Sequence, residues 1–365
     1  MRLSSLTACL AASLALATAG CGASATPGDA AGDPDALGGI AVQRQLDDLY
    51  ADAKKAGETQ VVVYGPGQEF YEPAYRVFMR RYPAIKVVSE SIFGEKLNTR
   101  LDQEFASGKH VGSVQTHGGS GTAAAVKAGR CEGYQPFTAG YLTPDQVGPG
   151  NTYHAFVHFG VGIEYNSDKL TADQAPKGWQ ELADPKWKGR LAAVDPAIVG
   201  ATALMISNLM TEQKLDEAWV RGTLANKPLI VDTAALAEQA VARGERDVML
   251  VNNTGVFTTS KKKNLPVAFV FPTAEGARLD TMYACLLKGG PNPNATKLFT
   301  NWLFTAEAQA ELAKTGVFGT RPGTAAPPGF PTLDAIKDKI IPQIPVDQQG
   351  PEAQKTVGLI KQIQG

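Results

Sequence analysis

Short polar and glycine-rich segments follow apolar runs at five places in this sequence, and they are its main candidates for chemistry. Backbone N–H groups at the start of a helix can bind anionic or polar atoms, and glycine lets the backbone approach a ligand closely. Each segment alone is as consistent with an ordinary turn or helix cap. Their repetition at consecutive strand ends favours one shared binding site. The candidates are Tyr64, Gly65, Gly67 and Gln68; His117, Gly118, Gly119 and Ser120; Gly200, Ala201 and Thr202; Asp232 and Thr233; and Asn252, Asn253 and Thr254.

The same segments lack a complete catalytic motif. The run from Gly118 to Thr122 departs from the G-x-S-x-G nucleophile elbow at its last position. The pair Gly65 and Gly67 is without the third glycine of a dinucleotide fingerprint, and the sequence has no P-loop, no C-x-x-C and no H-E-x-x-H. We therefore expect a binding protein without a cofactor, and an exported hydrolase is the rival class.

His154 and His158 stand four residues apart, a spacing that on a helix would place both on one face as a metal-binding pair. The flanking residues 156–163 are typical of a strand, in which four residues span roughly 13 Å, too far for one ion to bridge. The sequence therefore predicts no metal site here. His158 faces either the ligand or the core.

Short β-branched runs alternate with segments of helical periodicity, and these elements must position the candidates. Alternating strands and helices predict an α/β fold with largely parallel pairing. About 320 residues follow the N-terminal segments. Because a single hydrophobic core is normally smaller than this, we expect two lobes. The expected strands cover 60–64, 85–89, 113–116, 190–194, 229–231, 248–251 and 267–270, and the main expected helices cover 43–56, 95–106, 199–210, 234–242 and 292–315.

The N-terminal segment predicts export. Residues 1–20 begin with Arg2 and continue into an apolar stretch that is too short to span a bilayer, as in a signal peptide. The run ending in Cys21 resembles the bacterial lipobox, although Thr18 stands where Leu is usual; a plain secretory signal is the alternative. Residues 21–44 are rich in Ala, Gly, Asp and Pro and predict a flexible, lipid-anchored tether. We expect attachment to the cell membrane, facing the periplasm or the extracellular side.

Charge and cysteine content narrow the partners further. A net charge of −1 argues against a nucleic-acid partner, which would call for a basic face. Cys9 leaves with the signal peptide and Cys21 is the lipidation candidate, so Cys131 and Cys285 remain. An oxidising compartment favours a disulfide between these two, with two buried free thiols as the alternative.

Several ordered segments resemble the type II periplasmic-binding-protein superfamily, in the branch that includes ferric-iron-binding, phosphonate-binding and sugar-phosphate-binding proteins of ABC importers. They are the opening strand 62–65, the Y-N-x-x-K-L turn at 165–170, the W-x-x-L and P-x-W-K-G segments within 179–189, and the stretches 240–245 and 291–295. The likeness extends from about residue 45 to 350.

The resemblance implies an α/β, two-lobed, type II fold with the ligand cleft between the lobes, at strand ends and helix starts. Lobe 1 is then expected to take 45–140 and 278–320, and lobe 2 to take 141–277 and 321–365. Cys131 and Cys285 both fall in lobe 1, where a bridge leaves the hinge free. The implied partners are a small-molecule ligand and an ABC transporter permease, and we expect a monomer. A ligand sensor for a membrane receptor would use the same fold.

One departure from the resemblance bears on the ligand. Iron-binding relatives usually follow the paired asparagines with two tyrosines, whereas this sequence has Thr254 and Gly255 there. Gln68 stands near the place of a histidine ligand, and Glu95 alone matches the family's carboxylate. The sequence thus disfavours iron and favours a small polar organic ligand, plausibly one with a phosphate, phosphonate or carboxylate. These loops show no arginine clamp, and ferric iron is the alternative cargo.

Overall fold

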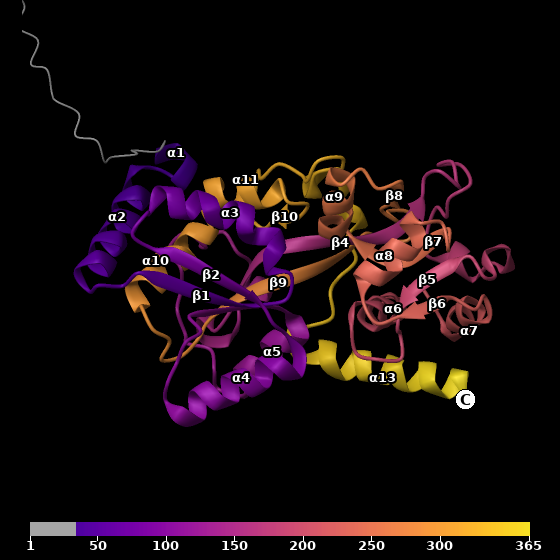
Figure 1. Ribbon diagram of the computed structural model, residues 1–365, viewed down its shortest axis with the longest axis horizontal. Coiled ribbons are helices and arrows are strands. Elements are labelled where there is room, and N and C mark those ends of the chain that lie inside the picture. The colour runs from indigo at the N-terminus through magenta and orange to yellow at the C-terminus, as the bar shows by residue number, and fades with distance from the viewer. Residues whose placement is uncertain (1–33) are drawn as a thin grey trace, which may run out of the picture. The chain divides into compact units, whose positions relative to one another are not determined.

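A ten-stranded sheet runs through residues 34–365, the part of the chain that the computed structural model describes (Figure 1). Its main path has the order β2-β1-β3-β9-β4-β7-β5-β6, and β8 and β10 both pair with β4. The strands are β1 (Gln60–Gly65), β2 (Lys86–Ser91), β3 (Val114–Gly118), β4 (His154–Asn166), β5 (Leu191–Val194), β6 (Leu229–Val231), β7 (Val248–Asn253), β8 (Val267–Val270), β9 (Arg278–Leu286) and β10 (Phe318–Gly319).

The prediction of largely parallel pairing is wrong for the middle of the sheet, where the strands pair antiparallel, and it holds only toward both ends. The strand β1 pairs in parallel with β2 and β3, and β5 does so with β6 and β7. The long strands β4 and β9 pair antiparallel with each other, and each joins one of the parallel groups. Two parallel α/β halves are therefore connected through β4 and β9, which run from one group of helices to the other in Figure 1.

The main expected helices are present, one of them divided in two, and α7 (Glu217–Ala225) and α13 (Val346–Gln364) are additional to those expected from the sequence. The expected helix over 292–315 is two helices: the first ends with Phe304 as its C-cap, and Thr305 caps the second by accepting a hydrogen bond from the Ala308 N–H at 3.2 Å. In the described residues no helix has the length and apolar character needed to cross a membrane. The α-helices are α1 (Pro34–Leu37), α2 (Ile40–Lys55), α3 (Gln68–Arg81), α4 (Gly94–Ser107), α5 (Gly119–Lys127), α6 (Ala201–Thr211), α7 (Glu217–Ala225), α8 (Ala234–Ala242), α9 (Thr254–Lys262), α10 (Pro293–Leu303), α11 (Ala306–Ala313), α12 (Leu333–Ile336) and α13 (Val346–Gln364).

The N-terminal part differs from the predicted tether. Residues 34–44 are mostly helical and not the predicted flexible tether, since α1 and the first turn of α2 occupy all of them except Gly38 and Gly39. Leu37 is only 1% exposed, and α1 packs against α2 and α11. An apolar side chain that is buried against other helices stabilises a segment whose composition alone favours flexibility. The predicted signal peptide, Cys21 and the tether up to residue 33 lie outside the described residues.

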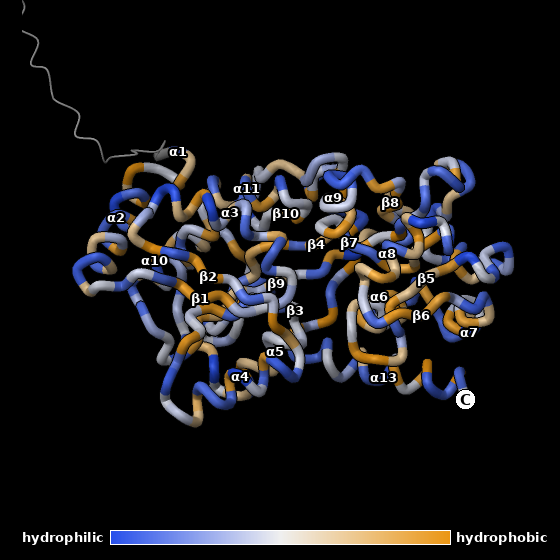
Figure 2. The backbone as a smooth tube through the Cα atoms, viewed as in Figure 1, coloured by the Kyte–Doolittle hydropathy of each residue, from blue (hydrophilic) through white to orange (hydrophobic). Residues whose placement is uncertain are grey.

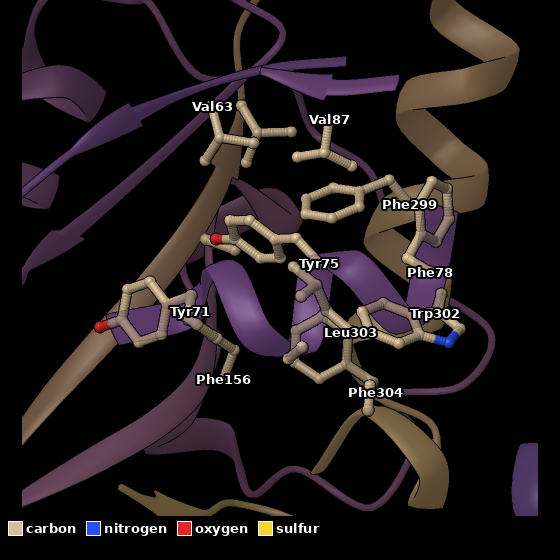
Figure 3. Packing of buried hydrophobic residues seen from close by; sticks show 14 of the residues in the cluster. Val63, Tyr71, Tyr75, Phe78, Val87, Phe156, Phe299, Trp302, Leu303 and Phe304 are labelled. Atoms are coloured by element: carbon tan, nitrogen blue, oxygen red, sulfur yellow. The ribbon is translucent and has the colours of Figure 1, made fainter. Parts of the chain in front are cut away.

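The first large hydrophobic cluster packs α3 and α10 against β1 (Figure 3). Phe78 lies at its centre and meets the rings of Phe299 and Trp302 at centroid distances of 5.3 and 5.4 Å. Tyr75 contacts Phe299 from the next turn of α3. Edge-on aromatic contacts of this kind add to the free energy gained from area burial. The cluster fixes the helices that follow β1 and β9.

The second large cluster draws on a different part of the chain. It gathers Trp179, Trp187 and Trp219 around β5 and β7, and Figure 2 shows hydrophobic residues along β5 and β6. The strand β4 contributes to both clusters, with Phe156–Phe159 in the first and Val161 onward in the second. The two cores therefore meet near Gly160. The boundaries at 140/141 and 277/278 stay a prediction.

A disulfide joins Cys131 to Cys285, with the two Cα atoms 5.6 Å apart, and confirms the predicted pairing. Both cysteines belong to one small buried cluster with Tyr153 and Tyr283. Because Cys285 lies on β9 and pairs across the ladder with Gln115 on β3, the bridge ties the segment after α5 to the middle of the sheet. A cross-link that closes a long loop typically stabilises a domain by about 2–4 kcal/mol.

A third segment runs beside β4 and β9 toward the C-terminus. Ala277 donates to Lys339 at 2.7 Å and accepts from the Ile341 N–H at 3.0 Å, which pairs this segment in parallel with the start of β9. The chain then enters α13, which packs against both α5 and α6 (Figure 1). Expected to belong to lobe 2, α13 thus contacts elements that follow strands of both halves of the sheet.

Candidate ligand-binding site

A cavity of about 670 Å³ lies among the starts of α4, α5 and α6, the strand β9 and the residues that lead into α13. It has the size of a site for a small organic molecule. Because α4 and α5 follow strands beside the first cluster and α6 follows β5 in the second, the cavity lies between the two halves of the sheet. This is the position that the family resemblance predicts.

Three of the helices that reach the cavity begin without a side-chain cap, whereas α8, which reaches it through Ala234, is capped by Thr233. The N-cap residues of the three are Phe93, Gly118 and Gly200, none of which has a side chain that can accept a hydrogen bond from the first N–H groups of its helix. The first N–H groups of a helix have no partner within the helix, and together with the helix dipole they favour acceptor or anionic atoms. Three helix starts thus direct donors toward one volume.

The rest of the wall is largely apolar. Leu97 and Leu204 line it from α4 and α6, and Met282 lines it from β9. Phe93 and Val199 also face the cavity and are 60% and 46% exposed, although large apolar side chains normally avoid water. A ligand with an apolar part would cover them. The cavity therefore suits an organic molecule better than a bare inorganic ion.

The arginine missing from the predicted loops is supplied by β9. Arg278 lines the cavity with only 5% exposure, and its Nη1 lies 2.5 Å from Oδ1 of Asp280. From the sequence, residue 278 is expected only to begin the second segment of lobe 1, and no ligand contact is predicted there. The available signal was the Arg-x-Asp spacing, which on a strand places both side chains on one face.

Six of the sequence-predicted residues line the cavity. The structure brings together His117, Gly118, Gly119 and Ser120 at the start of α5 with Gly200 and Ala201 at the start of α6. Gly119 is closely covered by Gln349 of α13, since a Cβ at this glycine would lie 2.3 Å from the Gln349 side-chain oxygen. The absence of a side chain therefore lets α13 reach the cavity, a contribution that the sequence did not indicate.

The first predicted segment lies behind the cavity wall. The Tyr64 hydroxyl donates to Glu104 at 2.8 Å, and Gln68 donates through Nε2 to Thr116 at 2.6 Å. Gly65 is needed because a Cβ there would lie 1.9 Å from the Thr116 carbonyl oxygen, and Gly67 has a positive φ of 66°. Glu95 is exposed on α4 and is not part of the wall.

The last predicted segments hold structural hydrogen bonds. Asn253 accepts from the N–H groups of Gly255 and Val256 at 3.0 Å and so caps α9, and Thr233 caps α8 by accepting from Leu236 at 3.3 Å. Asn252 donates to Glu164 at 2.9 Å, and the Thr254 hydroxyl accepts from Gly160 at 3.1 Å. None of these, nor Asp232 or Thr202, is among the residues that line the cavity. A ligand contact by any of them stays a prediction.

The histidines near the site are held uncharged. Burial lowers the pKa of His158 to about 4, and its Nδ1 lies 2.8 Å from the Thr281 hydroxyl. His158 is buried on β4 and does not line the cavity, so the open choice between core and ligand is decided for the core. Burial also lowers the pKa of His117, which does line the cavity. Near neutral pH it offers the ligand an uncharged ring.

Residues 74–338 match the family described as bacterial extracellular solute-binding protein. The chain belongs to this family. Among its relatives, "Iron uptake protein A1" of Synechocystis is 29% identical over 185 residues, which are 47% of this chain and 49% of that protein. The "Fe(3+)-binding periplasmic protein" of Serratia marcescens is 24% identical over 190 residues, 50% of this chain and 55% of that protein. The chain thus matches about half the length of these relatives.

Solved structures of two-lobed type II binding proteins share the fold of this solute-binding protein. Iron-bound HitA from Pseudomonas aeruginosa superposes with a TM-score of 0.68 at 20% identity, over 84% of this chain and 99% of that one. The periplasmic binding protein AfuA from Actinobacillus pleuropneumoniae, bound to fructose-6-phosphate, gives 0.68 at 20% identity, over 83% and 97%. These likenesses establish an α/β, two-lobed type II fold. The two named ligands differ in chemistry, so the fold does not select one.

The cavity of this solute-binding protein has few of the anionic oxygen ligands that a ferric ion requires. The residues lining its cavity include one carboxylate, from Asp280, and no tyrosine. Within residues 34–365 no group of three or more His, Cys, Asp or Glu side chains is placed to hold a metal ion. The backbone donors and apolar groups of the cavity instead fit the oxygen atoms and carbon skeleton of an organic solute.

Proposed function

We propose that this protein captures a small polar organic solute outside the cell membrane and delivers it to an ABC transporter permease. The observation that carries the proposal is the cavity described above, on which three uncapped helix starts open beside apolar walls. Family membership supports the capture of a solute. Delivery to a permease, attachment through Cys21 and action as a monomer belong to the proposal.

In the mechanism that we propose, the two halves of the sheet close around the solute. Phe93 reaches the cavity from α4 in one half, and Val199 reaches it from the loop before α6 in the other. A solute that contacts both walls binds a closed arrangement better than an open one, so it shifts the population toward closure. The permease then recognises the closed shape. A sensor for a membrane receptor would use the same step with a different partner.

Ferric iron is the second candidate cargo, favoured by the printed names of relatives at 24–29% identity. Against it stand the single carboxylate in the cavity wall and Thr254, whose hydroxyl is engaged with the backbone of Gly160. Hard trivalent iron calls for several anionic oxygen ligands. The organic solute is therefore the better-supported cargo.

The proposal is tested by native mass spectrometry of gently purified protein, followed by calorimetry with the solute that co-purifies. We expect an organic mass rather than iron. Gly200 lines the cavity at the start of α6, and a Cβ there meets nothing within 4 Å, so Gly200→Leu should take up ligand space in the cavity while the fold is kept. The co-purified solute should then be lost.

The matched control is Gly140→Leu, because Gly140 is exposed, also has no atom within 4 Å of an added Cβ, and lies away from the cavity. This variant should retain the solute. Bound iron in the wild-type protein, or equal solute retention by both variants, would contradict the proposed function.

A further inference from the structure

We propose that Arg278 binds an acidic group of the solute and that Asp280 is the counter-ion which this acid replaces. The ligand class is thus an organic acid whose carbon skeleton lies on the apolar wall. The inference deepens the proposed function and rests on it, because it concerns the same cavity. It goes further by assigning a charge to the solute and a residue to that charge.

The geometry of β9 directs the pair into the cavity. Side chains two residues apart on a strand share a face, and Arg278, Asp280 and Met282 all line the cavity. Met282 pairs across the ladder with Gly118, the residue before α5, and its sulfur lies 4.0 Å from the position of a Cβ on that glycine. One strand face therefore leads from the guanidinium to an uncapped helix start.

Arg278 is incompletely bonded for a buried cation. Its side chain is 6% exposed, and within residues 34–365 neither Nε nor Nη1 has an acceptor in hydrogen-bond geometry; the nearby Asp280 oxygen is close to Nη1 but misaligned. Leaving a buried donor without an acceptor costs on the order of 1–3 kcal/mol, and more for a charged group. An acid group in the cavity would supply the acceptor.

Two other largely buried arginines show what a structural arginine looks like in this chain. Arg81 donates from Nε and Nη2 to both oxygens of Glu307, at 3.0 and 2.6 Å. Arg130 donates to Asn98 at 3.1 Å and also bonds Asp102. Both are held by aligned acceptors and do not line the cavity themselves, whereas Arg278 lines the cavity and leaves Nε and Nη1 without an acceptor.

Charge in the cavity favours an acid as the occupant. Arg278 and Asp280 cancel each other, and His117 is uncharged because burial lowers its pKa. The helix starts behind Phe93, Gly118 and Gly200 add partial positive charge. An acid would be stabilised by these ends and by Arg278, and repelled by Asp280, which is 31% exposed and free to turn away.

The test uses carboxylates, phosphate monoesters and phosphonates, each beside an uncharged alcohol or amide of the same carbon skeleton. Thermal shift selects binders and calorimetry measures their affinity. We expect at least one acid to bind the wild-type protein and its neutral partner to bind far more weakly. Arg278→Met should lower the affinity for the acid on the order of a hundred-fold. Asp280→Asn should raise this affinity by about ten-fold, because a like charge is removed.

Three further variants separate this role from general effects. Arg278→Met alone leaves Asp280 unpaired and could impair folding. The double variant Arg278→Met with Asp280→Asn removes both charges, so it avoids this problem. It should also bind the acid far more weakly than the wild type. Arg278→Lys keeps the charge but not the bidentate fork, and should bind at an intermediate level. Arg76→Met removes an exposed arginine on α3, 57% exposed in its side chain, and should bind as the wild type does.

Three results would each overturn the inference: neutral partners that bind as tightly as the acids, unchanged affinity in both variants with methionine at position 278, or no binding by any acid. Weaker binding in Asp280→Asn would overturn the counter-ion assignment. A neutral organic solute found by native mass spectrometry would defeat the acid assignment while leaving the proposed capture function standing. Failure of Gly200→Leu to displace any solute would defeat the capture function itself.

Discussion

Four helix starts have similar sequences but differ in whether a side chain caps them: two pairs can be compared, α5 and α6 on one side and α8 and α9 on the other. Each follows a strand and begins with small or polar residues. The first two begin at Gly118 and Gly200 without a side-chain cap, and they open on the cavity. The last two are capped by Thr233 and Asn253; of these two, α8 reaches the edge of the cavity through Ala234, and no residue of α9 lines it. A cap satisfies the same N–H groups that would otherwise bind a ligand, so one helix start cannot fully serve both purposes.

The comparison is tested most severely by giving the cavity helices the caps that they lack. Gly118 and Gly200 have extended backbone conformations that suit a capping residue, and a Cβ meets nothing closer than 4.0 Å at Gly118. The double variant Gly118→Asp with Gly200→Asp should bind an acidic solute on the order of a thousand-fold more weakly, because each carboxylate occupies the N–H groups and repels the acid.

Its unfolding temperature should rise at the same time, since each cap stabilises a helix. Calorimetry and thermal unfolding measure the two effects on one preparation. Unchanged affinity with raised stability would show that these N–H groups do not contact the solute.

The buried carboxyl group of Glu164 on β4 should make the free energy of unfolding depend on pH. Burial, with the nearby Glu238 carboxylate, raises the pKa of Glu164 to about 8, while its bond from Asn252 opposes the shift. A folded-state pKa above the unfolded value means that this stability is complete below about pH 4.5 and is lost as pH rises toward 8. Between pH 5 and 8 the wild type should lose about 3–4 kcal/mol relative to Glu164→Gln.

Urea unfolding across this pH range checks the prediction. Glu245→Gln is the control, because Glu245 is exposed and should leave the wild-type profile unchanged. Parallel profiles for wild type and Glu164→Gln would show that Glu164 titrates normally.

Removing the cap of α9 should separate stability from binding. Asn253→Ala deletes the acceptor of two N–H groups and should lower the free energy of unfolding by about 1.5 kcal/mol. Because Asn253 does not line the cavity, affinity should stay within about two-fold of wild type, which is less than one lost hydrogen bond costs. Denaturant titration and calorimetry give both values. A large loss of affinity in a stable protein would return Asn253 to the binding site, as sequence analysis suggested.

The smallest effect is expected at the start of α8. Thr233 is exposed and accepts one hydrogen bond, at 3.3 Å, so Thr233→Ala should cost about 0.5–1 kcal/mol of stability. The first residue of α8, Ala234, reaches the cavity wall, and affinity for the solute should nevertheless be retained. Thermal unfolding beside calorimetry decides the case. Weaker binding without any loss of stability would place the Thr233 hydroxyl at the ligand.

The glycine-rich starts of α5 and α6 could be predicted from sequence because glycine itself carries the signal: it leaves the backbone open. The segment from Asn252 to Thr254 could not be judged in the same way. Asparagine and threonine are favoured both as helix caps and as ligand contacts, and only the position of their neighbours tells the two apart. Arg278 was missed for a related reason, since nothing around it in the sequence shows that β9 passes the cavity.

Local chemistry in the sequence determined the alternation of strands and helices, the glycine-rich helix starts and the membership that its ordered segments indicated. These features depend on neighbours within a few residues of one another. Tertiary structure decided which helix starts open on the cavity, that β9 supplies the buried Arg278, and that α13 reaches Gly119. These features join residues far apart in the chain, whose proximity arises from packing two cores around β4 and β9.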